Sequence, residues 1–510
     1  MKKRYAILPL LSVVFSSSLH SEEKQPNILL FLVDDMGWQD TSLPFHSERT
    51  TLNNRYNTPN MEQLAQMGTK FSQAYASSVS SPSRCSLLTG VNASRHRVTN
   101  WTHIKNQSTD EPHLLLNSPN WNVNGIQPVE GIDNSFPATS FVQILSQNGY
   151  ATIHCGKAHF GATDTPSANP LNYGFDINIA GHAAGGLASY LGLERFGHDE
   201  NGQPISPFAI PDMEEYWDKD IFITEALTQE AIKALDKTIT KEVPFFLYMS
   251  HYAVHVPLQA DNRFVGKYID QGLPYPEAAY ASMIEGMDKS LGDLMQYLRK
   301  KGELDNTIIL FMSDNGGYSL QGRTPPLHIQ NAPLRSGKGS AYDGGIREPM
   351  IVYWNGVTEP GSTIDEYVII EDFFPSILDM AQIKRYKTIQ NIDGESFVPL
   401  LKGKKTKHPL RSLIWNMPNN WISGDNREQG IGATCTIRRG DYKLIYWYED
   451  GKKELYNLRS DIGETENIAT SLPRVTKKLS RLLSKKLRKA EAQRPSYKLS
   501  GEPCNWPDFK

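Results

Sequence analysis

Nearly continuous apolar segments recur along the chain, and they constrain its fold more than any other feature. Each is five to seven residues long, and helical patterns or long connections separate them. Strands buried on both faces have this composition, and they occur in parallel sheets covered by helices. The segments that we predict to be strands are residues 28–33, 150–155, 245–250, 307–313 and 350–354.

Amphipathic segments with helix start and stop signals fill the intervals. We predict helices at residues 58–68, 139–148, 221–236 and 278–301. Alternating strands and helices predict an α/β fold with a large mixed, mostly parallel sheet flanked by helices on both faces. A chain of 510 residues exceeds the usual size of a single core, so we expect one large domain and a smaller one.

The pattern changes after Leu401, where a short run of lysines and glycine indicates an exposed connection. Residues 442–448 and 454–458, separated by Asp450-Gly451, are typical of an antiparallel hairpin. We therefore predict a large α/β domain at residues 22–401 and a smaller α+β domain, built on an antiparallel sheet, at residues 402–510.

A basic helical pattern spans residues 474–494 of the smaller domain. Such a helix is compatible with binding a membrane surface or a polyanion. The interpretation that we favour at this point is the solvated face of a helix packed on the hairpin.

The first 21 residues have the pattern of a secretory signal peptide. Lys2, Lys3 and Arg4 precede an apolar run at residues 6–15, and three serines follow it. The run is too short to span a bilayer, and no later run reaches about 18 apolar residues. We expect a protein that is exported to the periplasm or the extracellular space and has no membrane span.

Charge and cysteine usage exclude several classes of protein. The 53 Lys and Arg residues balance the 56 Asp and Glu residues, which argues against a nucleic-acid-binding protein. The four cysteines (Cys85, Cys155, Cys435 and Cys504) are far apart and form no Cys-x-x-Cys pair. Neither a zinc knuckle nor a disulfide-rich scaffold is indicated, and the sequence leaves their pairing open.

Polar and ionisable residues follow four of the predicted strands directly. They are Asp34-Asp35, Gly156-Lys157-Ala158-His159, His251 with His255, and Asp314-Asn315-Gly316. Ligands of open α/β sheets bind beyond the carboxyl ends of the strands. Each group alone is compatible with a turn, a surface charge or a core histidine. Together they place carboxylates, an amide, imidazoles and a lysine at one edge, which indicates a bound ligand.

Three carboxylates and one amide oxygen, from Asp34, Asp35, Asp314 and Asn315, form an oxygen-rich set suited to a hard divalent cation. We expect Ca²⁺, with Mg²⁺ as the alternative, rather than zinc. Adjacent residues of a regular strand point to opposite faces. Asp34 and Asp35 can therefore share one ion only if the chain has already turned between them.

The segment from Ser80 to Gly90 (Ser-Ser-Pro-Ser-Arg-Cys-Ser-Leu-Leu-Thr-Gly) combines a helix start with anion-binding residues. Pro82 suits the first turn of a helix, and a helix N-terminus attracts a phosphate or sulfate group. Arg84 lies one turn further on with a planar fork of donors. Taken alone, this stretch favours an ordinary N-cap serine, because Ser and Pro are the usual residues at helix starts.

Taken together, these motifs resemble the type I sulfatases of the alkaline phosphatase superfamily over nearly the full mature length. The sulfatase signature (Cys or Ser, any residue, Pro, a small residue, Arg, then Thr-Gly) matches Ser80, Pro82, Arg84 and Thr89-Gly90. Further family-like segments are residues 26–35, 156–159, 255–257, 313–316, 337–339 and 344–347.

The resemblance implies a role for each matching residue. Ser80 becomes formylglycine (3-oxoalanine), whose hydrated aldehyde supplies the nucleophile and one oxygen to the metal. The metal ligands are Asp34, Asp35, Ser80, Asp314 and Asn315. Lys157 and Lys338 neutralise the sulfate, and Arg84 holds the formylglycine. His255 protonates the leaving alcohol, His159 helps to expel sulfate, and Asp314 accepts the proton of the nucleophile.

Some positions depart from the family pattern. Ala158 and Phe160 replace an aromatic residue and a leucine, and Val254 replaces a proline. These changes affect the shape of the pocket rather than the sulfate chemistry. Cys85 is not the modified residue, because Leu87 stands where the signature requires proline.

The resemblance also implies a sulfated carbohydrate substrate. The segments 38–42 and 255–260 are similar to those of bacterial exo-sulfatases acting on galactose or N-acetylgalactosamine sulfates. Some aromatic and histidine residues of the predicted loops are suited to contacting sugars, although a structural role explains each of them individually. They are Trp101, His103, Trp121, His182 and Trp421. The sugar, the sulfate position and the oligomeric state stay open.

A serine at position 80 implies a partner enzyme, because the serine C–H bond needs a radical, oxygen-independent oxidant for conversion to formylglycine. Two other functions remain open. One is a phosphodiesterase or phosphonate monoester hydrolase of the same superfamily, which shares the nucleophile and the metal motif. The other is a catalytically silent glycan-binding protein, if Ser80 is never matured.

Overall fold

The computed structural model describes residues 24–404, 408 and 410–508, so the predicted signal peptide at residues 1–21 lies outside it. Its main feature is a nine-stranded sheet in which eight strands follow one another and β12 (Val368–Ile369) pairs with β2. The order of the eight is β11 (Ser362–Ile364), β2 (Thr69–Tyr75), β10 (Arg347–Tyr353), β9 (Thr307–Ser313), β1 (Asn27–Val33), β8 (Phe245–Ser250), β6 (Ala151–Gly156) and β7 (Ile177–Ile179).

The strand β1 occupies the centre of this sheet, between β8 and β9, and runs parallel to both. Strand β6 continues the parallel arrangement. Strand β10 is antiparallel to its neighbours β2 and β9. The predicted mixed, mostly parallel sheet is therefore confirmed.

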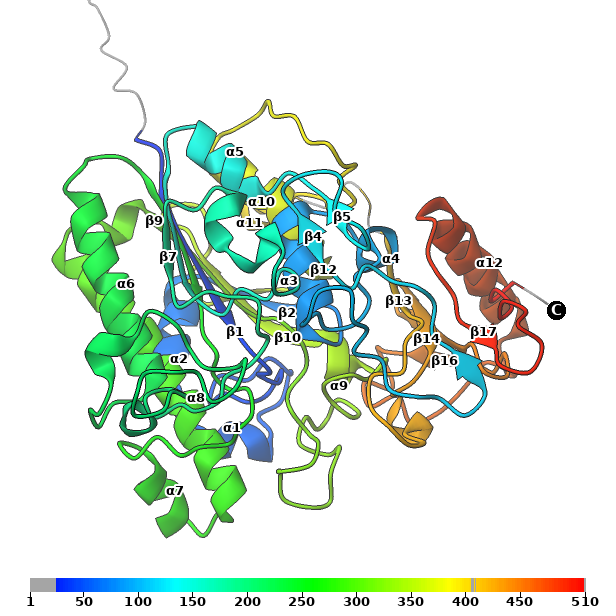
Figure 1. The fold of residues 1–510 in the computed structure, drawn as a ribbon. Helices are drawn as coiled ribbons and strands as arrows, with labels where there is room; N and C mark the ends of the chain where they lie inside the picture. Colours follow the sequence, from blue (N-terminus) through cyan, green and yellow to red (C-terminus); the bar gives the residue numbers. More distant parts are fainter. Residues whose placement is uncertain (1–23, 405–407, 409, 509–510) are drawn as a thin grey trace, which may run out of the picture.

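Alternate side chains of β1 enter two different cores, one on each face of the sheet. Leu29, Phe31 and Val33 pack with residues of α6 (Ile223–Ile239) and α8 (Tyr275–Lys300). The side chains of Ile28, Leu30 and Leu32 pack with residues of α5 (Phe141–Gln147) and α10 (Phe373–Met380). Figure 1 shows α6 and α8 away from α5 and α10, with the sheet between the two groups. Burial on both faces explains why these strands are apolar throughout.

A separate antiparallel sheet forms in the C-terminal part of the chain, as predicted. Its strands are β13 (Ser412–Met417), β14 (Thr434–Arg439), β15 (Tyr442–Trp447) and β16 (Lys453–Asn457). The helix α12 (Pro473–Lys489) packs on it through Leu479, Leu483 and Leu487. Trp415 of β13 belongs to the core of the large sheet, and its Nε1 donates to the Ala76 carbonyl at 2.8 Å. The two sheets are therefore packed together, and the boundary at residues 401/402 stays a prediction.

Shorter elements complete the described chain. The helices are α1 (Thr51–Arg55), α2 (Pro59–Met67), α3 (Ser80–Thr89), α4 (Ala93–His96), α7 (Val265–Asp270), α9 (Asp343–Ile346) and α11 (Val398–Leu401). Two-residue strands pair β17 (Ser496–Tyr497) with β3 (Leu116–Asn117), and β4 (Ile126–Gln127) with β5 (Phe136–Pro137).

Two further observations concern the helices and the cysteines of the described residues. None of their helices combines the length and apolar character that crossing a membrane requires. All four cysteines are free and buried. Cys85 lies inside α3, and burial raises the pKa of its thiol to about 12, which suits a packing role.

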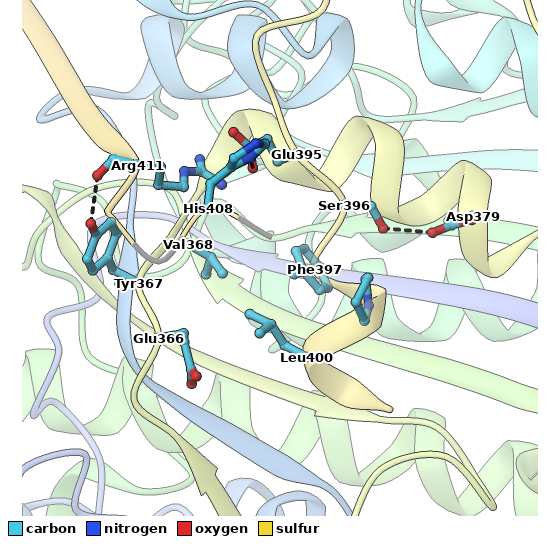
Figure 2. A pocket seen from close by; sticks show the side chains of 11 residues that line it. Glu366, Tyr367, Val368, Asp379, Glu395, Ser396, Phe397, Leu400, His408 and Arg411 are labelled. Carbon is cyan, nitrogen blue, oxygen red and sulfur yellow. Dashed lines mark hydrogen bonds and ion pairs between the residues drawn. The ribbon is translucent and has the colours of Figure 1, made fainter. Parts of the chain in front are cut away.

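One surface pocket lies beside β12 and the connection that follows α10 (Figure 2). The Tyr367 hydroxyl donates to the Arg411 carbonyl there, and Ser396 donates to Asp379. None of the residues that line this pocket belongs to the site predicted from the sequence. The residues of that predicted site lie elsewhere, at the ends of the central strands.

Candidate active site

The chain turns between the two aspartates that follow β1. Asp35 has a φ of 61°, in the left-handed region, so the strand has ended before it. Both side chains are fully buried. The condition under which Asp34 and Asp35 can face one site is therefore met.

The predicted carboxylates meet at this point. Oxygens of Asp34, Asp35 and Asp314 lie within 4.8 Å of one another. Asp314 follows β9, the neighbour of β1, and its Oδ1 accepts from the Asp35 backbone N–H at 3.3 Å. The Asn315 Nδ2 donates to Asp35 Oδ1 at 2.8 Å, which leaves the amide oxygen facing Ser80. All four side chains are buried, in an arrangement that three anionic groups would not adopt without compensating cations.

Ser80 is the first residue of α3, and its side chain points into this cluster rather than capping the helix. Its Oγ lies 3.2 Å from Asp34 Oδ1 and 3.1 Å from Asn315 Oδ1, and it accepts from Lys157 Nζ at 3.1 Å. Residue 79 is the N-cap, and it makes no side-chain capping bond. The N-cap interpretation of Ser80 is therefore wrong, and the serine is available for chemistry.

Three cations surround the carboxylates. Lys157 Nζ donates to Asp34 Oδ2 at 2.6 Å, and Lys338 Nζ lies 2.7 and 2.9 Å from the two Asp35 oxygens. The Arg84 Nε donates to Asp314 Oδ2 at 2.8 Å, while its Nη1 donates to the Ser250 hydroxyl and the Lys157 carbonyl. Each carboxylate is thus paired with one cation, which offsets the cost of burying the charges.

The two lysines respond differently to burial. Desolvation outweighs the opposing effect of Asp34, so the pKa of Lys157 is lowered. Desolvation also acts on Lys338, but Asp35 and then Asp34 raise its pKa above the usual value. The pKa of Lys338 is therefore raised and that of Lys157 lowered, although each ammonium group contacts a carboxylate.

The predicted histidines lie at two different places in the site. His255 is the more open, with 19% of its side chain exposed, and its Nε2 lies 3.8 Å from Asp35 Oδ2. Burial, followed by the Lys338 charge, lowers the pKa of His255 to about 3. His159 is buried, and its Nε2 lies 2.9 Å from both the Ser81 hydroxyl and the Thr102 carbonyl. Through Nε2, His159 thus contacts the residue after Ser80 rather than Ser80 itself.

His251 is not brought to the site, although it follows β8 directly. Its Nε2 lies 2.8 Å from the Ser290 hydroxyl on α8, and its ring packs on Phe31. This histidine belongs to the core, which is the simpler of the two interpretations that its sequence position allowed.

The residues proposed to contact sugars also divide into core residues and residues near the site. Trp121 is 3% exposed, and its Nε1 lies 3.1 Å from both Ser108 and Asp110, so it has a structural role. Trp101 and His103 flank Thr102 and form a row of rings with Phe208. Because Thr102 contacts His159, this row begins beside the site. Phe208 carried no sequence signal of its own.

Glu348 is an acidic neighbour of the site that the sequence analysis missed. It is fully buried in β10, and within the described residues neither of its carboxyl oxygens has a hydrogen-bond partner. Burial, then the charges of Asp314 and Asp35, raises its pKa well above the usual value. The signal that could have found it is an acidic residue placed just before the apolar run predicted as a strand at residues 350–354.

Glycines bring a loop against the two site histidines. A Cβ on Gly185 would lie 2.2 Å from the His159 ring, and one on Gly186 would lie 3.0 Å from His255. The loop can approach both rings only because these residues lack side chains. Sequence reasoning did not single out either glycine.

The donor set fits a hard divalent cation. Three carboxylates and an amide oxygen converge in a buried site without thiolate ligands, and Ca²⁺ and Mg²⁺ prefer such oxygens. The three neighbouring cations already balance the three carboxylates, so a divalent ion would make the site positive. A positive, buried site next to a hydroxyl attracts an anionic ester.

The fold and this site together define an enzyme that acts on an anionic ester at the carboxyl edge of an α/β sheet. Comparison with known proteins gives the class a name. The Sulfatase family profile matches residues 26–383, and the chain belongs to that family. It is a sulfuric ester hydrolase, and the resemblance to type I sulfatases is confirmed. A second profile, "N-sulphoglucosamine sulphohydrolase, C-terminal", matches residues 337–493.

The similarity to individual proteins extends over most of both chains. A sulfatase of Formosa agariphila is 28% identical over 92% of this chain and 90% of its own. Human N-acetylgalactosamine-6-sulfatase is 27% identical over 94% of this chain and 88% of its own. The solved structure of Ps i-CgsB in complex with k-i-k-neocarrahexaose superimposes with a TM-score of 0.71 and is 27% identical, covering 91% of this chain and 93% of that one.

Proposed function

We propose that the protein removes sulfate from a sulfated glycan, using a formylglycine made from Ser80 together with a divalent cation. The observation that carries this proposal is the position of Ser80 Oγ. It lies within hydrogen-bond distance of a predicted metal ligand (Asp34), a second predicted ligand (Asn315) and a cation (Lys157). A structural serine would not need all three.

Asp34, Asp35, Asp314 and Asn315 would hold the ion, with residue 80 as a further ligand. When bound, such an ion acts as a Lewis acid and lowers the pKa of a coordinated hydroxyl group. Ca²⁺ is our first choice and Mg²⁺ the alternative, because both take carboxylate and amide oxygens.

The cations have separate tasks in this proposal. Lys157 and Lys338 would neutralise the oxygens of the transferred sulfate, where negative charge is concentrated. Arg84 would hold residue 80 and Asp314 in place, since it already bridges Asp314 and the Lys157 carbonyl. Asp314 would accept the proton of the nucleophile. Formylglycine at position 80 would supply a hydroxyl nucleophile that can later regenerate its aldehyde and release sulfate.

The two histidines would move protons. His255, at the open side of the site, would protonate the leaving alcohol through Nε2, because its Nδ1 lies 2.8 Å from the Val256 carbonyl. A bound sulfate anion would favour the protonated ring. His159 would assist the release of sulfate, and its contact with Ser81 places it next to residue 80.

The substrate proposal draws on the relatives. Those named N-acetylgalactosamine-6-sulfatase, and the structure determined with a neocarrahexaose, support a carbohydrate sulfate. We propose exo action on galactose or N-acetylgalactosamine sulfates. We also propose export to the periplasm or extracellular space, and maturation by a serine-type radical enzyme.

The test is a comparison of kcat/KM on 4-nitrophenyl sulfate, bis(4-nitrophenyl) phosphate, and the 4- and 6-sulfates of galactose and N-acetylgalactosamine. The proposal expects the sulfate esters to be preferred, with one sugar sulfate best of all. A preference for the phosphodiester would support the phosphodiesterase instead. Sugar binding without turnover by matured protein would support a silent binding protein.

The metal proposal has its own readouts. Dialysis against EDTA is expected to lower turnover at least about 100-fold, because Lewis-acid assistance is worth several kcal/mol. Titration of Ca²⁺ into the stripped protein should release heat and raise its Tm. In the Asp314→Ala variant, added Ca²⁺ should neither release heat nor raise the Tm. Full turnover in EDTA, with no metal in the protein, would contradict the proposal.

A further inference from the structure

The helix α12 carries a charge of one sign only. Its 17 residues include eight of the 53 Lys and Arg residues of the chain and none of the 56 Asp and Glu residues. The two long helices of the large domain differ, since α6 and α8 each contain both signs. The remainder of the chain consequently carries a net negative charge.

The cations of α12 lie along one face of the helix. At 100° per residue, seven of the eight fall within an arc of about 120°, and they extend along about 22 Å of helix. This basic stripe consists of Arg474, Lys477, Lys478, Arg481, Lys485, Arg488 and Lys489, all of them exposed. The apolar face lies opposite, where Leu479, Leu483 and Leu487 are buried against the antiparallel sheet. The orientation of the stripe toward solvent is therefore fixed by packing.

Little in the described part of the chain compensates the stripe. Arg488 pairs with Asp508, and no other stripe residue has an ion pair there. Four pairs of like charges stand at i,i+4 (474–478, 477–481, 481–485 and 485–489), a spacing that destabilises a helix. By contrast, α8 places Asp293 four residues after Lys289, and the two are paired. A solvated face that serves solubility alone can mix both signs, as α8 does.

We propose that the basic stripe docks an extended polyanionic chain, namely the sulfated polysaccharide whose sulfates the active site removes. The identity of the polyanion rests on the proposed function, while the existence of the docking surface rests on α12 alone. Charge complementarity argues for it, because a linear array of cations matches the repeated sulfates of a polymer and gains affinity by releasing its counterions.

Two arginine side chains near the active-site region contact backbone carbonyl groups at the C-terminal end of α12. The Arg95 Nη1 lies 3.4 Å from the Lys489 carbonyl, and Arg97 donates to the Glu491 carbonyl. Arg95 belongs to α4, which follows the helix that begins at Ser80. Lys486 lies on the flank of the stripe, where burial and then the Arg411 charge lower its pKa. The C-terminal end of α12 thus contacts the segment that follows the helix beginning at Ser80.

Two other occupants fit less well. A helix that binds a membrane inserts its apolar face into the lipid, but here that face is buried in the protein. A single-stranded nucleic acid is bound by cations interleaved with aromatic side chains, and the stripe contains none. The sulfated polymer therefore remains the occupant that the chemistry favours.

The experiment uses the full mature chain and a triple variant, Lys477→Gln/Arg481→Gln/Lys485→Gln. The matched control is Lys237→Gln/Lys241→Gln/Lys300→Gln, which removes the same charge from exposed positions of α6 and its C-terminal flank and of α8. Figure 1 shows α6 and α8 on the opposite side of the molecule from α12. Affinity for dextran sulfate is measured between 50 and 300 mM NaCl, roughly the range over which such binding weakens.

The stripe variant is expected to bind dextran sulfate about tenfold more weakly and with a shallower salt dependence. The control should match the wild type, and turnover of 4-nitrophenyl sulfate should be unchanged in all three. Equal loss in both variants, or no loss in either, would overturn the proposal. Loss of binding to phosphatidylserine vesicles alone would also overturn it, in favour of a membrane. Because binding is measured without turnover, failure of the proposed function would appear separately, as inactivity toward sulfate esters.

Discussion

At the scale of single residues, His255 allows the most specific test of the proton transfer. We expect His255→Ala to lower kcat/KM for a sugar sulfate by about 100-fold or more, and to affect 4-nitrophenyl sulfate much less. A sugar alkoxide needs a proton as it leaves, whereas a nitrophenolate does not. Steady-state kinetics on both substrates provides the measurement. Equal losses on the two would remove His255 from the role of acid.

A second residue-scale prediction concerns acid stability. His154 is buried among Phe160, Phe175 and Tyr248, and burial lowers its pKa to about 3. In the unfolded chain, His154 binds a proton near pH 6.5. The contribution of neutral His154 to the free energy of unfolding is therefore complete above that pH and is lost as the pH falls toward 3. At pH 5 the loss is about 2 kcal/mol.

The variant His154→Phe tests whether His154 causes the loss of stability at acidic pH. It should lose some stability at pH 7, because the contact between Nδ1 and Asn178 is removed, yet its unfolding free energy should fall less between pH 7 and pH 5. Urea denaturation at both pH values measures the difference. An identical pH dependence in variant and wild type would show that His154 does not titrate as described.

At the scale of elements, the antiparallel sheet holds the segment that carries Lys338. Lys443 of β15 is buried and lies 2.8 Å from Asp343 Oδ1 and 2.9 Å from Glu464 Oε1. The Asp343 backbone N–H donates to Glu464, and the Ala341 N–H donates to the Gly430 carbonyl. Residues 338–343 are therefore fastened to the C-terminal part of the chain at several points.

Lys443→Met should accordingly destabilise the protein by about 3–5 kcal/mol, because buried Glu464 loses its cation and buried Asp343 keeps only the longer ion pair with Arg347, at 3.6 Å. Adding Glu464→Gln should recover part of that loss, since one of the stranded charges is removed. Urea unfolding of the single and double variants measures both effects. A Lys443→Met protein as stable as the wild type would contradict the proposal that Lys443 holds residues 338–343 to the C-terminal part of the chain.

The sequence predicted the central strands well, but not all elements that position the site. β1, β8 and β9 were found because burial on both faces makes them apolar throughout. β2 was missed, although it leads toward Ser80, because Lys70 and Gln73 interrupt its pattern and are only partly buried. β10 begins with Arg347, Glu348 and Pro349, which are not apolar strand formers, so its start was predicted three residues too late, at residue 350.

At the scale of the whole molecule, the edge at which the site forms could be predicted, because parallel strands deliver their ends to one side. Contacts between distant segments could not. Nothing local marks Lys443 as the partner of Asp343, which is 100 residues away. His251 and His255 have similar positions after β8, and only the packing of α8 separates the core histidine from the site histidine.

The central claim is that catalysis depends on chemical conversion of Ser80, and one paired measurement tests it most directly. The protein is made in one host with only a cysteine-type maturation system and in another with a serine-type radical enzyme. The mass of the peptide spanning Ser80 and the turnover of a sulfate ester are then determined for each preparation. We predict plain serine and little activity in the first host, and formylglycine with turnover in the second. Ser80→Cys should gain both in the first host, and Ser80→Ala should fold but stay inactive in either. Robust turnover by a preparation shown to contain only unmodified Ser80 would contradict the account.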